Sequence, residues 1–75
     1  MAAMTVESEV TGNVWKVLVA VGDTVAQGQE LMILESMKME IPVEAPCAGQ
    51  VAELLVAVDE AVAEDQALAV VAPSP

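Results

Sequence analysis

An internal repeat accounts for most of this chain. Shifted by 37 positions, residues 12–21 align with residues 49–58, and the match continues beyond them. The positions of the first copy that keep their residue in the second are 12, 14, 18, 19, 20, 21, 25, 26, 29 and 31. They include Gly, Gln and Leu, which chance agreement in a Val- and Ala-rich chain explains poorly. Two copies of one supersecondary unit in 75 residues predict a pseudo-two-fold domain and not a stacked array.

The repeat also decides between helix and strand in the second copy. Residues 52–68 are rich in helix formers, so propensity alone predicts a helix there. Their counterpart in the first copy, Lys16–Val21, is rich in β-branched residues and precedes the turn pair Gly22-Asp23. Because equivalent sequences should share a fold, we expect strands in both copies and an all-β domain.

Turn and strand signals give a coarse map. The expected strands are Val6–Val10, Val14–Val21, Thr24–Ala26, Gln29–Leu34, Met39–Val43, Val51–Val58, Ala61–Ala63 and Leu68–Val71, with a frayed end at Ala72–Pro75. Pro42 argues against a helix over residues 31–45 and restricts its strand to a sheet edge or a bulge. The joint between the copies falls near Lys38 and should form a connection at the pole opposite the termini.

Size and charge limit the function. We expect one domain over residues 1–75, with a core over about 5–72, because a chain this short leaves no room for a catalytic cleft of ordinary size. A carrier or binding module is therefore expected, and not an enzyme. Twelve carboxylates oppose two lysines, and the net charge of −10 argues against nucleic-acid and anionic membrane partners. The same charge favours a soluble monomer.

The cysteine and the N-terminus predict a cytoplasmic protein. Cys47 has no internal disulfide partner, and a chain without His offers it no basic neighbour to activate a thiol. We therefore expect Cys47 to be a small apolar filler. Residues 1–9 lack the basic and apolar regions of a signal peptide, and no apolar run reaches the roughly 18 residues that a membrane span needs.

The most unusual local feature is the segment Glu35-Ser36-Met37-Lys38-Met39-Glu40. Lys38 is one of only two basic residues, flanked by two thioethers and then by acids. A neutral lysine amine is a nucleophile, so a singular exposed lysine is a candidate for covalent modification. None of residues 35–41 is Gly, Asn or Pro, so a tight turn here would be strained, as backbone at functional sites often is. Core packing is the alternative role of the two methionines.

The chain also contains Gly22-Asp-x-Val-x-x-Gly28-Gln-x-Leu31, followed by Glu35-Ser-Met-Lys38-Met. Over about residues 5–72 this pattern resembles the biotinyl/lipoyl attachment domain family, and most closely the small stand-alone biotin/lipoyl attachment proteins of bacteria. The resemblance implies a flattened barrel of two four-stranded antiparallel sheets related by a quasi-dyad. It places the modified lysine, Lys38 here, in the hairpin between the fourth and fifth strands.

By this resemblance the chain is a biotin carboxyl carrier. A biotin protein ligase would activate biotin as its adenylate, and the Lys38 amine would form an amide with it. Glu35 and Glu40 should favour the protonated amine, so we expect the ligase to supply the base. The implied partners are a biotin carboxylase and a carboxyltransferase of an acyl-CoA-type carboxylase. They act in trans, unless the chain is a piece of a larger protein. No metal is implied.

Two alternatives stay open. Met37 and Met39 are expected to separate biotin from lipoate, because family members that carry lipoate typically show Asp-Lys-Ala at these positions. The first alternative is nevertheless a lipoyl carrier of a 2-oxoacid dehydrogenase or a glycine cleavage system. The second is an interaction module, not a carrier, whose lysine is merely exposed.

Some residues depart from the family pattern or from the repeat. Ser36 stands where Ala is commoner in the family. In the second copy Asp59-Glu60 replaces Gly22-Asp23, and Asp65 replaces Gly28, so these turns must form without glycine. Trp15 aligns with Ala52 and is expected to cover an open side of the barrel.

Overall fold

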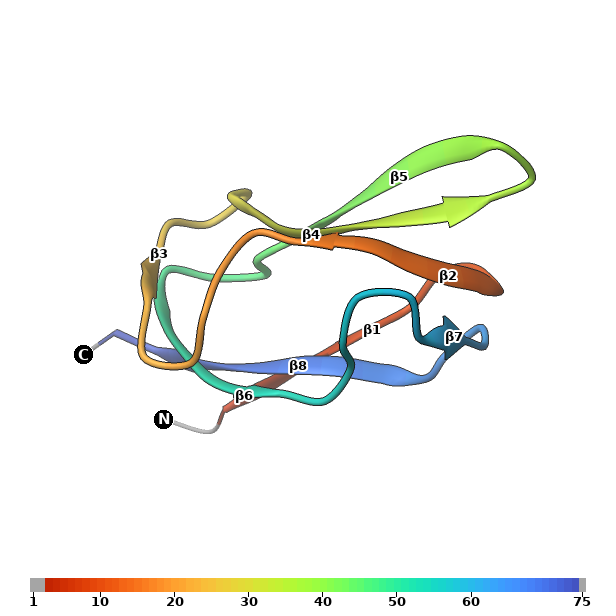
Figure 1. Ribbon diagram of the computed structural model, residues 1–75. Coiled ribbons are helices and arrows are strands. Elements are labelled where there is room, and N and C mark those ends of the chain that lie inside the picture. The colour runs from red at the N-terminus through yellow and green to blue at the C-terminus, as the bar shows by residue number, and fades with distance from the viewer. Residues whose placement is uncertain (1–2, 75) are drawn as a thin grey trace.

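The computed structural model describes residues 3–74, which form a two-layer β-sandwich (Figure 1). Its strands are β1 (Met4–Glu7), β2 (Gly12–Val17), β3 (Thr24–Val25), β4 (Glu30–Ser36), β5 (Met39–Glu44), β6 (Gly49–Leu54), β7 (Ala61–Val62) and β8 (Ala67–Pro73). They make two four-stranded antiparallel sheets, ordered β1-β8-β6-β3 and β5-β4-β2-β7. The described residues contain no helix, so the all-β prediction is confirmed. Over residues 3–74 there is likewise no helix long and apolar enough to cross a membrane.

The two halves are related by a pseudo-two-fold axis, as the repeat predicts. One sheet order becomes the other when β1 is exchanged for β5, β2 for β6, β3 for β7 and β4 for β8. Backbone bonds repeat in the same way. The Gly22 N–H donates to the Val51 carbonyl at 2.8 Å, and the equivalent Asp59 N–H donates to the Val14 carbonyl at 2.8 Å. Each half therefore supplies strands to both sheets.

The second half makes its turns with aspartate where the first half has glycine. Gly22 has a φ of +96°, and its equivalent Asp59 has a φ of +72°. Gly28 has a φ of +83°, and its equivalent Asp65 has a φ of +69°. Aspartate enters this left-handed region more readily than most residues do, so the turn geometry survives the loss of glycine.

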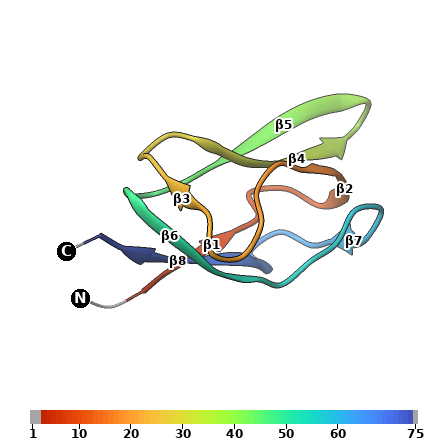
Figure 2. The ribbon, with the colours of Figure 1, turned by 60° about the vertical axis from the view of Figure 1, so that its left-hand side comes forward.

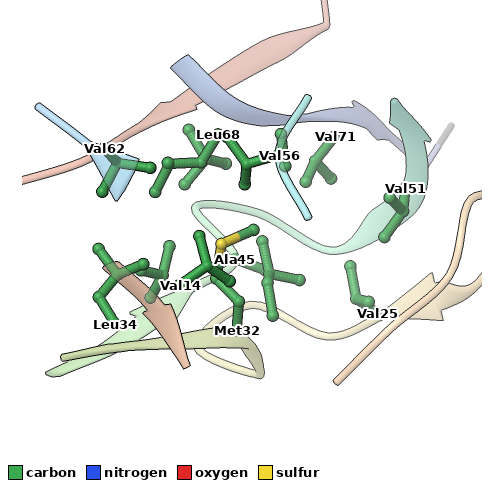
Figure 3. Close-up of a cluster of buried hydrophobic side chains, with 14 residues drawn as sticks. Val14, Val25, Met32, Leu34, Ala45, Val51, Val56, Val62, Leu68 and Val71 are labelled. Atoms are coloured by element: carbon green, nitrogen blue, oxygen red, sulfur yellow. The ribbon is translucent and has the colours of Figure 1, made fainter. Parts of the chain in front are cut away.

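The core fills the space between the sheets with short aliphatic side chains (Figure 3). Leu31, Met32 and Leu34 of β4 are fully buried, and so is Leu68 of β8. Val, Leu and Met have no polar atoms to satisfy, so a thin sandwich can close over them without a single aromatic residue in the core. Cys47 is partly buried against this cluster, which agrees with its predicted role as an apolar filler.

The prediction for Trp15 is wrong. Val14 points into the core and is 1% exposed, so the next side chain along β2 points outward. Trp15 is 38% exposed, and the Lys16 amine lies 4.4 Å from the centroid of its ring. Trp15 therefore lies on the outer face and covers no opening of the barrel.

Two long predicted strands end early. The strand predicted over Val14–Val21 ends at Val17, and the one predicted over Val51–Val58 ends at Leu54. Leu18 and Leu55 still donate to Leu31 and Leu68 of their own sheets. The chain then crosses to the other sheet, where the N–H groups of Gly22 and Asp59 donate to Val51 and Val14 of the opposite half. Strand propensity continues through residues 18–21, but the sheet partner changes, so regular pairing stops.

The predicted ends of the chain also need correction. The strand predicted over Val6–Val10 is β1, Met4–Glu7, because the Ser8 hydroxyl turns in and donates to the Val10 carbonyl at 2.6 Å. The end predicted as frayed instead continues β8 to Pro73, and the Ser74 N–H donates to the Ala48 carbonyl at 3.0 Å. Pro75 lies outside the described residues. The other strands lie within two residues of their predicted ends.

Pro42 lies in β5, an edge strand, as its chemistry requires. Because proline has no N–H to donate, and because Glu40 and Glu44 flank it on the same strand, this edge is a poor template for a further strand. The edge strand β5 and its neighbour β4 are the two arms of the hairpin that carries Lys38.

Candidate functional site

A tight hairpin joins β4 to β5. The two strands pair as far as Ser36 and Met39, so only Met37 and Lys38 form the turn. Their φ values are +53° and +63°, the sign pattern of a type I′ turn. Gly or Asn normally fills such positions, and an L-residue in the left-handed region costs about 1–2 kcal/mol. The strain expected from the sequence is therefore located on Met37 and Lys38.

The turn stands at the pole opposite the two termini, as the position of the joint between the copies predicts (Figures 1 and 2). Met37 is 92% exposed, Met39 is 64% exposed, and Lys38 is exposed between them. Neither methionine is a core residue, so packing inside the domain does not explain them. Two thioethers and one amine are available to a partner at this tip.

Two carboxylates lie behind the turn. Glu35 of β4 and Glu40 of β5 are exposed cross-strand neighbours, in the pair that follows Ser36 and Met39. Like charges placed opposite each other on a sheet repel. The hairpin therefore carries one positive charge in its turn and two negative charges on the strands just behind it. All six residues predicted for the site lie together on this hairpin.

The hairpin presents a single amine on an otherwise acidic chain. The chain contains no His and no Arg. Within residues 3–74, no group of three or more His, Cys, Asp or Glu side chains is placed to hold a metal ion. An exposed amine can accept an acyl group when an enzyme brings the activated donor and the base. The geometry therefore places one accessible nucleophile at the tip of the hairpin.

The start of β2 braces the end of β4, a contact that sequence analysis did not identify. The Ser36 hydroxyl donates to the Thr11 carbonyl at 2.8 Å. Gly12 lies so close to β4 that an added Cβ would meet the Glu35 carbonyl oxygen and lie 3.1 Å from the Ser36 Cβ. The available signal was the repeat, which keeps glycine at this position in both copies as Gly12 and Gly49.

One known protein family matches nearly the whole chain. A family with the name biotin/lipoyl and the description "Biotin-requiring enzyme" matches residues 1–71. The chain belongs to the biotin/lipoyl family. This confirms the resemblance on which the sequence analysis drew, and the two four-stranded sheets found here agree with the fold it implied.

Curated relatives of this biotin/lipoyl domain are also named for biotin. A "Biotin/lipoyl attachment protein" of Bacillus subtilis is 60% identical over 40 residues, which are 53% of this chain and 55% of that protein. A "Biotin carboxyl carrier protein" of Streptococcus mutans is 59% identical over 39 residues, which are 52% of this chain and 30% of that protein. The matched part of the chain thus spans about half, or less, of the length of these relatives.

Solved structures place similar domains inside carboxylases. The urea carboxylase of Kluyveromyces lactis matches 96% of this chain with 36% identity and a TM-score of 0.90, over 6% of its own length. A single-chain, multi-domain long-chain acyl-CoA carboxylase matches 96% of this chain with 26% identity and a TM-score of 0.90, over 7% of its length. In each case the biotin/lipoyl fold is a small part of a much longer chain.

Proposed function

We propose that this biotin/lipoyl domain is a biotin carboxyl carrier and that Lys38 is its attachment residue. The observation that supports this most directly is the exposed Lys38 amine in the two-residue turn of the β4–β5 hairpin. The family's description as biotin-requiring and the S. mutans relative's name support biotin as the attached group. The only other lysine, Lys16, lies against Trp15 on β2, away from any turn.

The chemistry proposed for this chain is acceptance of one acyl group. The deprotonated Lys38 amine attacks the acyl carbon of biotinyl adenylate, an amide bond forms, and AMP leaves as the acyl–phosphate bond breaks. In this proposal the amine gives up its proton to a base on the ligase. Amide formation removes one positive charge, so the net charge falls from −10 to −11. The fold is needed to present the amine and has no part in the bond-forming chemistry.

The attached group gives the domain its role. When bound, biotin accepts a carboxyl group at one active site and releases it at another. The domain holds that group on the Met37–Lys38 turn and raises its effective concentration at the sites it visits. A biotin carboxylase and a carboxyltransferase are the proposed partners, which agrees with the occurrence of similar domains in urea and acyl-CoA carboxylases.

Lipoate is the second candidate cargo, because the B. subtilis relative is named for both groups. In this proposal Met37 and Met39 favour biotin. They lie on both sides of the amine and are strongly exposed, so a ligase that binds the Lys38 turn must contact their thioethers. Asp and Ala at the same positions would present a charge and a methyl group instead.

Intact-mass measurement tests the proposal. The chain is incubated with a biotin protein ligase, ATP and biotin, and separately with a lipoate ligase, ATP and lipoate. One biotinyl increment is expected in the first reaction. Lys38→Arg should abolish it, and the matched control Lys16→Arg should keep it. Labelling of the Lys38→Arg protein would refute the site, and a lipoyl increment alone would refute biotin as the cargo.

A further inference from the structure

Two equivalent carbonyls, Thr11 near the hairpin and Ala48 at the other pole, accept hydrogen bonds from different donors. In the second half the Ala48 carbonyl accepts the main-chain N–H of Ser74 at 3.0 Å. The repeat makes Thr11 equivalent to Ala48 and Met37 equivalent to Ser74. Met37, however, lies in the turn with a φ of +53°, so its backbone is committed to the hairpin.

At the hairpin pole a side chain, and not a main-chain N–H, donates to the equivalent carbonyl. The Thr11 carbonyl accepts the Ser36 hydroxyl at 2.8 Å. Thr11 is itself fixed from the other side, because its hydroxyl oxygen accepts the Glu64 N–H at 3.2 Å. The bond from Ser36 thus connects the last residue of β4 to a loop that is anchored in the second half of the chain.

We propose that Ser36 is a positioning residue for the Lys38 amine, and that its hydroxyl holds the strained turn in one orientation relative to the sandwich. This inference rests on the proposed function, since it assumes that the amine is the group a ligase must find. Two residues in the left-handed region make the turn intrinsically unfavourable. Alanine at this position would leave the Thr11 carbonyl without this donor.

The expected consequence concerns binding and not bond formation. If the turn samples several orientations, only a fraction of the molecules is competent to bind, and the apparent affinity falls by that fraction. Loss of one exposed hydrogen bond should change this population by roughly two- to tenfold. The KM of the ligase for the carrier should therefore rise by that factor while kcat stays unchanged.

The first measurement needs no ligase. Amide hydrogen exchange of Met39, which pairs with Ser36 next to the turn, is followed by NMR in the unmodified wild type and in Ser36→Ala. Exchange at this amide should be roughly two- to tenfold faster in the variant, with core amides such as that of Leu68 unchanged. Faster exchange throughout the domain would overturn the proposal, because it would mean a general loss of stability.

The second measurement is the kinetics of biotin transfer with the ligase that labels the wild type. Ser36→Thr keeps the hydroxyl and should restore both the exchange rate and KM. Ser74→Ala removes an exposed hydroxyl at the other pole and should leave both unchanged. An unchanged KM for Ser36→Ala would overturn the positioning role. If the wild type is not labelled at all, the proposed function fails, and the exchange data still decide whether Ser36 holds the turn.

Discussion

Glu35 and Glu40 lie directly opposite each other on the β4–β5 hairpin, in the second cross-strand pair behind the Lys38 turn. A second glutamate pair, Glu30 and Glu44, stands at the other end of the same hairpin. Like charges in register destabilise a sheet, so the arm that presents the amine is less stable than its hydrogen bonds alone would make it. The acidic surface of this carrier therefore has a structural cost at its most exposed element.

Removing one charge of the Glu35–Glu40 pair should stabilise the domain. Glu40→Gln is expected to raise the free energy of unfolding by about 0.2–1 kcal/mol, because the repulsion from Glu35 disappears. The gain should shrink as salt is added, since exposed charges are screened over about 8 Å at physiological ionic strength. Urea denaturation at low and high salt measures both effects. The matched control is Glu53→Gln, which removes the same charge opposite Val70, and an equal gain there would refute the cross-strand explanation.

Replacing the aspartates at left-handed turn positions by glycine should stabilise the domain. Asp59→Gly is expected to stabilise the domain by about 0.5–1 kcal/mol, because glycine relieves the strain at a φ of +72° by more than it adds to the entropy of the unfolded chain. Asp65→Gly should behave alike at a φ of +69°. Thermal and urea denaturation measure the change.

The control for the turn prediction lies in the same loop. Ala57 precedes Asp59 and is not among the described residues with positive φ. Ala57→Gly should therefore lower the free energy of unfolding by about 0.5–1 kcal/mol through chain entropy. Stabilisation by Ala57→Gly, or destabilisation by Asp59→Gly, would contradict the argument from backbone conformation.

Gly12 should tolerate no side chain. Gly12→Ala places a methyl group against the Glu35 carbonyl oxygen and next to Ser36, so β2 must move away from β4. We expect a loss of about 1–3 kcal/mol, the usual range for overpacking. Asn13→Ala, at an exposed position on the same strand, should change stability by less than about 0.5 kcal/mol. A neutral Gly12→Ala would show that the hairpin base is looser than the structure indicates.

The methionines should govern which ligase acts, without contributing to stability. Met37→Asp combined with Met39→Ala is expected to reduce biotin transfer and to increase lipoate transfer, measured as initial rates with each ligase. Both side chains are strongly exposed, so the free energy of unfolding should change by less than about 0.5 kcal/mol. Met4→Asp changes an exposed methionine on β1 and should leave both rates as they are. Unchanged biotin transfer in the double variant would exclude the methionine pair as the selectivity element.

The internal repeat in the sequence predicts the symmetry of the fold, its strands and the place of Lys38. The repeat gives the pseudo-two-fold symmetry, overrides helix propensity over residues 52–68 and locates Lys38 at the pole opposite the termini. It also identifies Asp59 and Asp65 as turn residues that must replace glycine. These features follow from local sequence compared with its own second copy, so they need no knowledge of distant contacts.

Other features were decided by the tertiary structure. Strand propensity extends β2 to Val21, but the strand ends at Val17 because the chain crosses to the other sheet between Leu18 and Gly22. Alternation along β2 turns Trp15 outward once Val14 is committed to the core. The brace at the hairpin joins Ser36 to Thr11, 25 positions earlier, and a contact at that separation exists only after the sheets have formed. Local patterning thus determined which residues form strands and turns, while long-range packing determined where strands stop and which side chains hold the turn of Lys38.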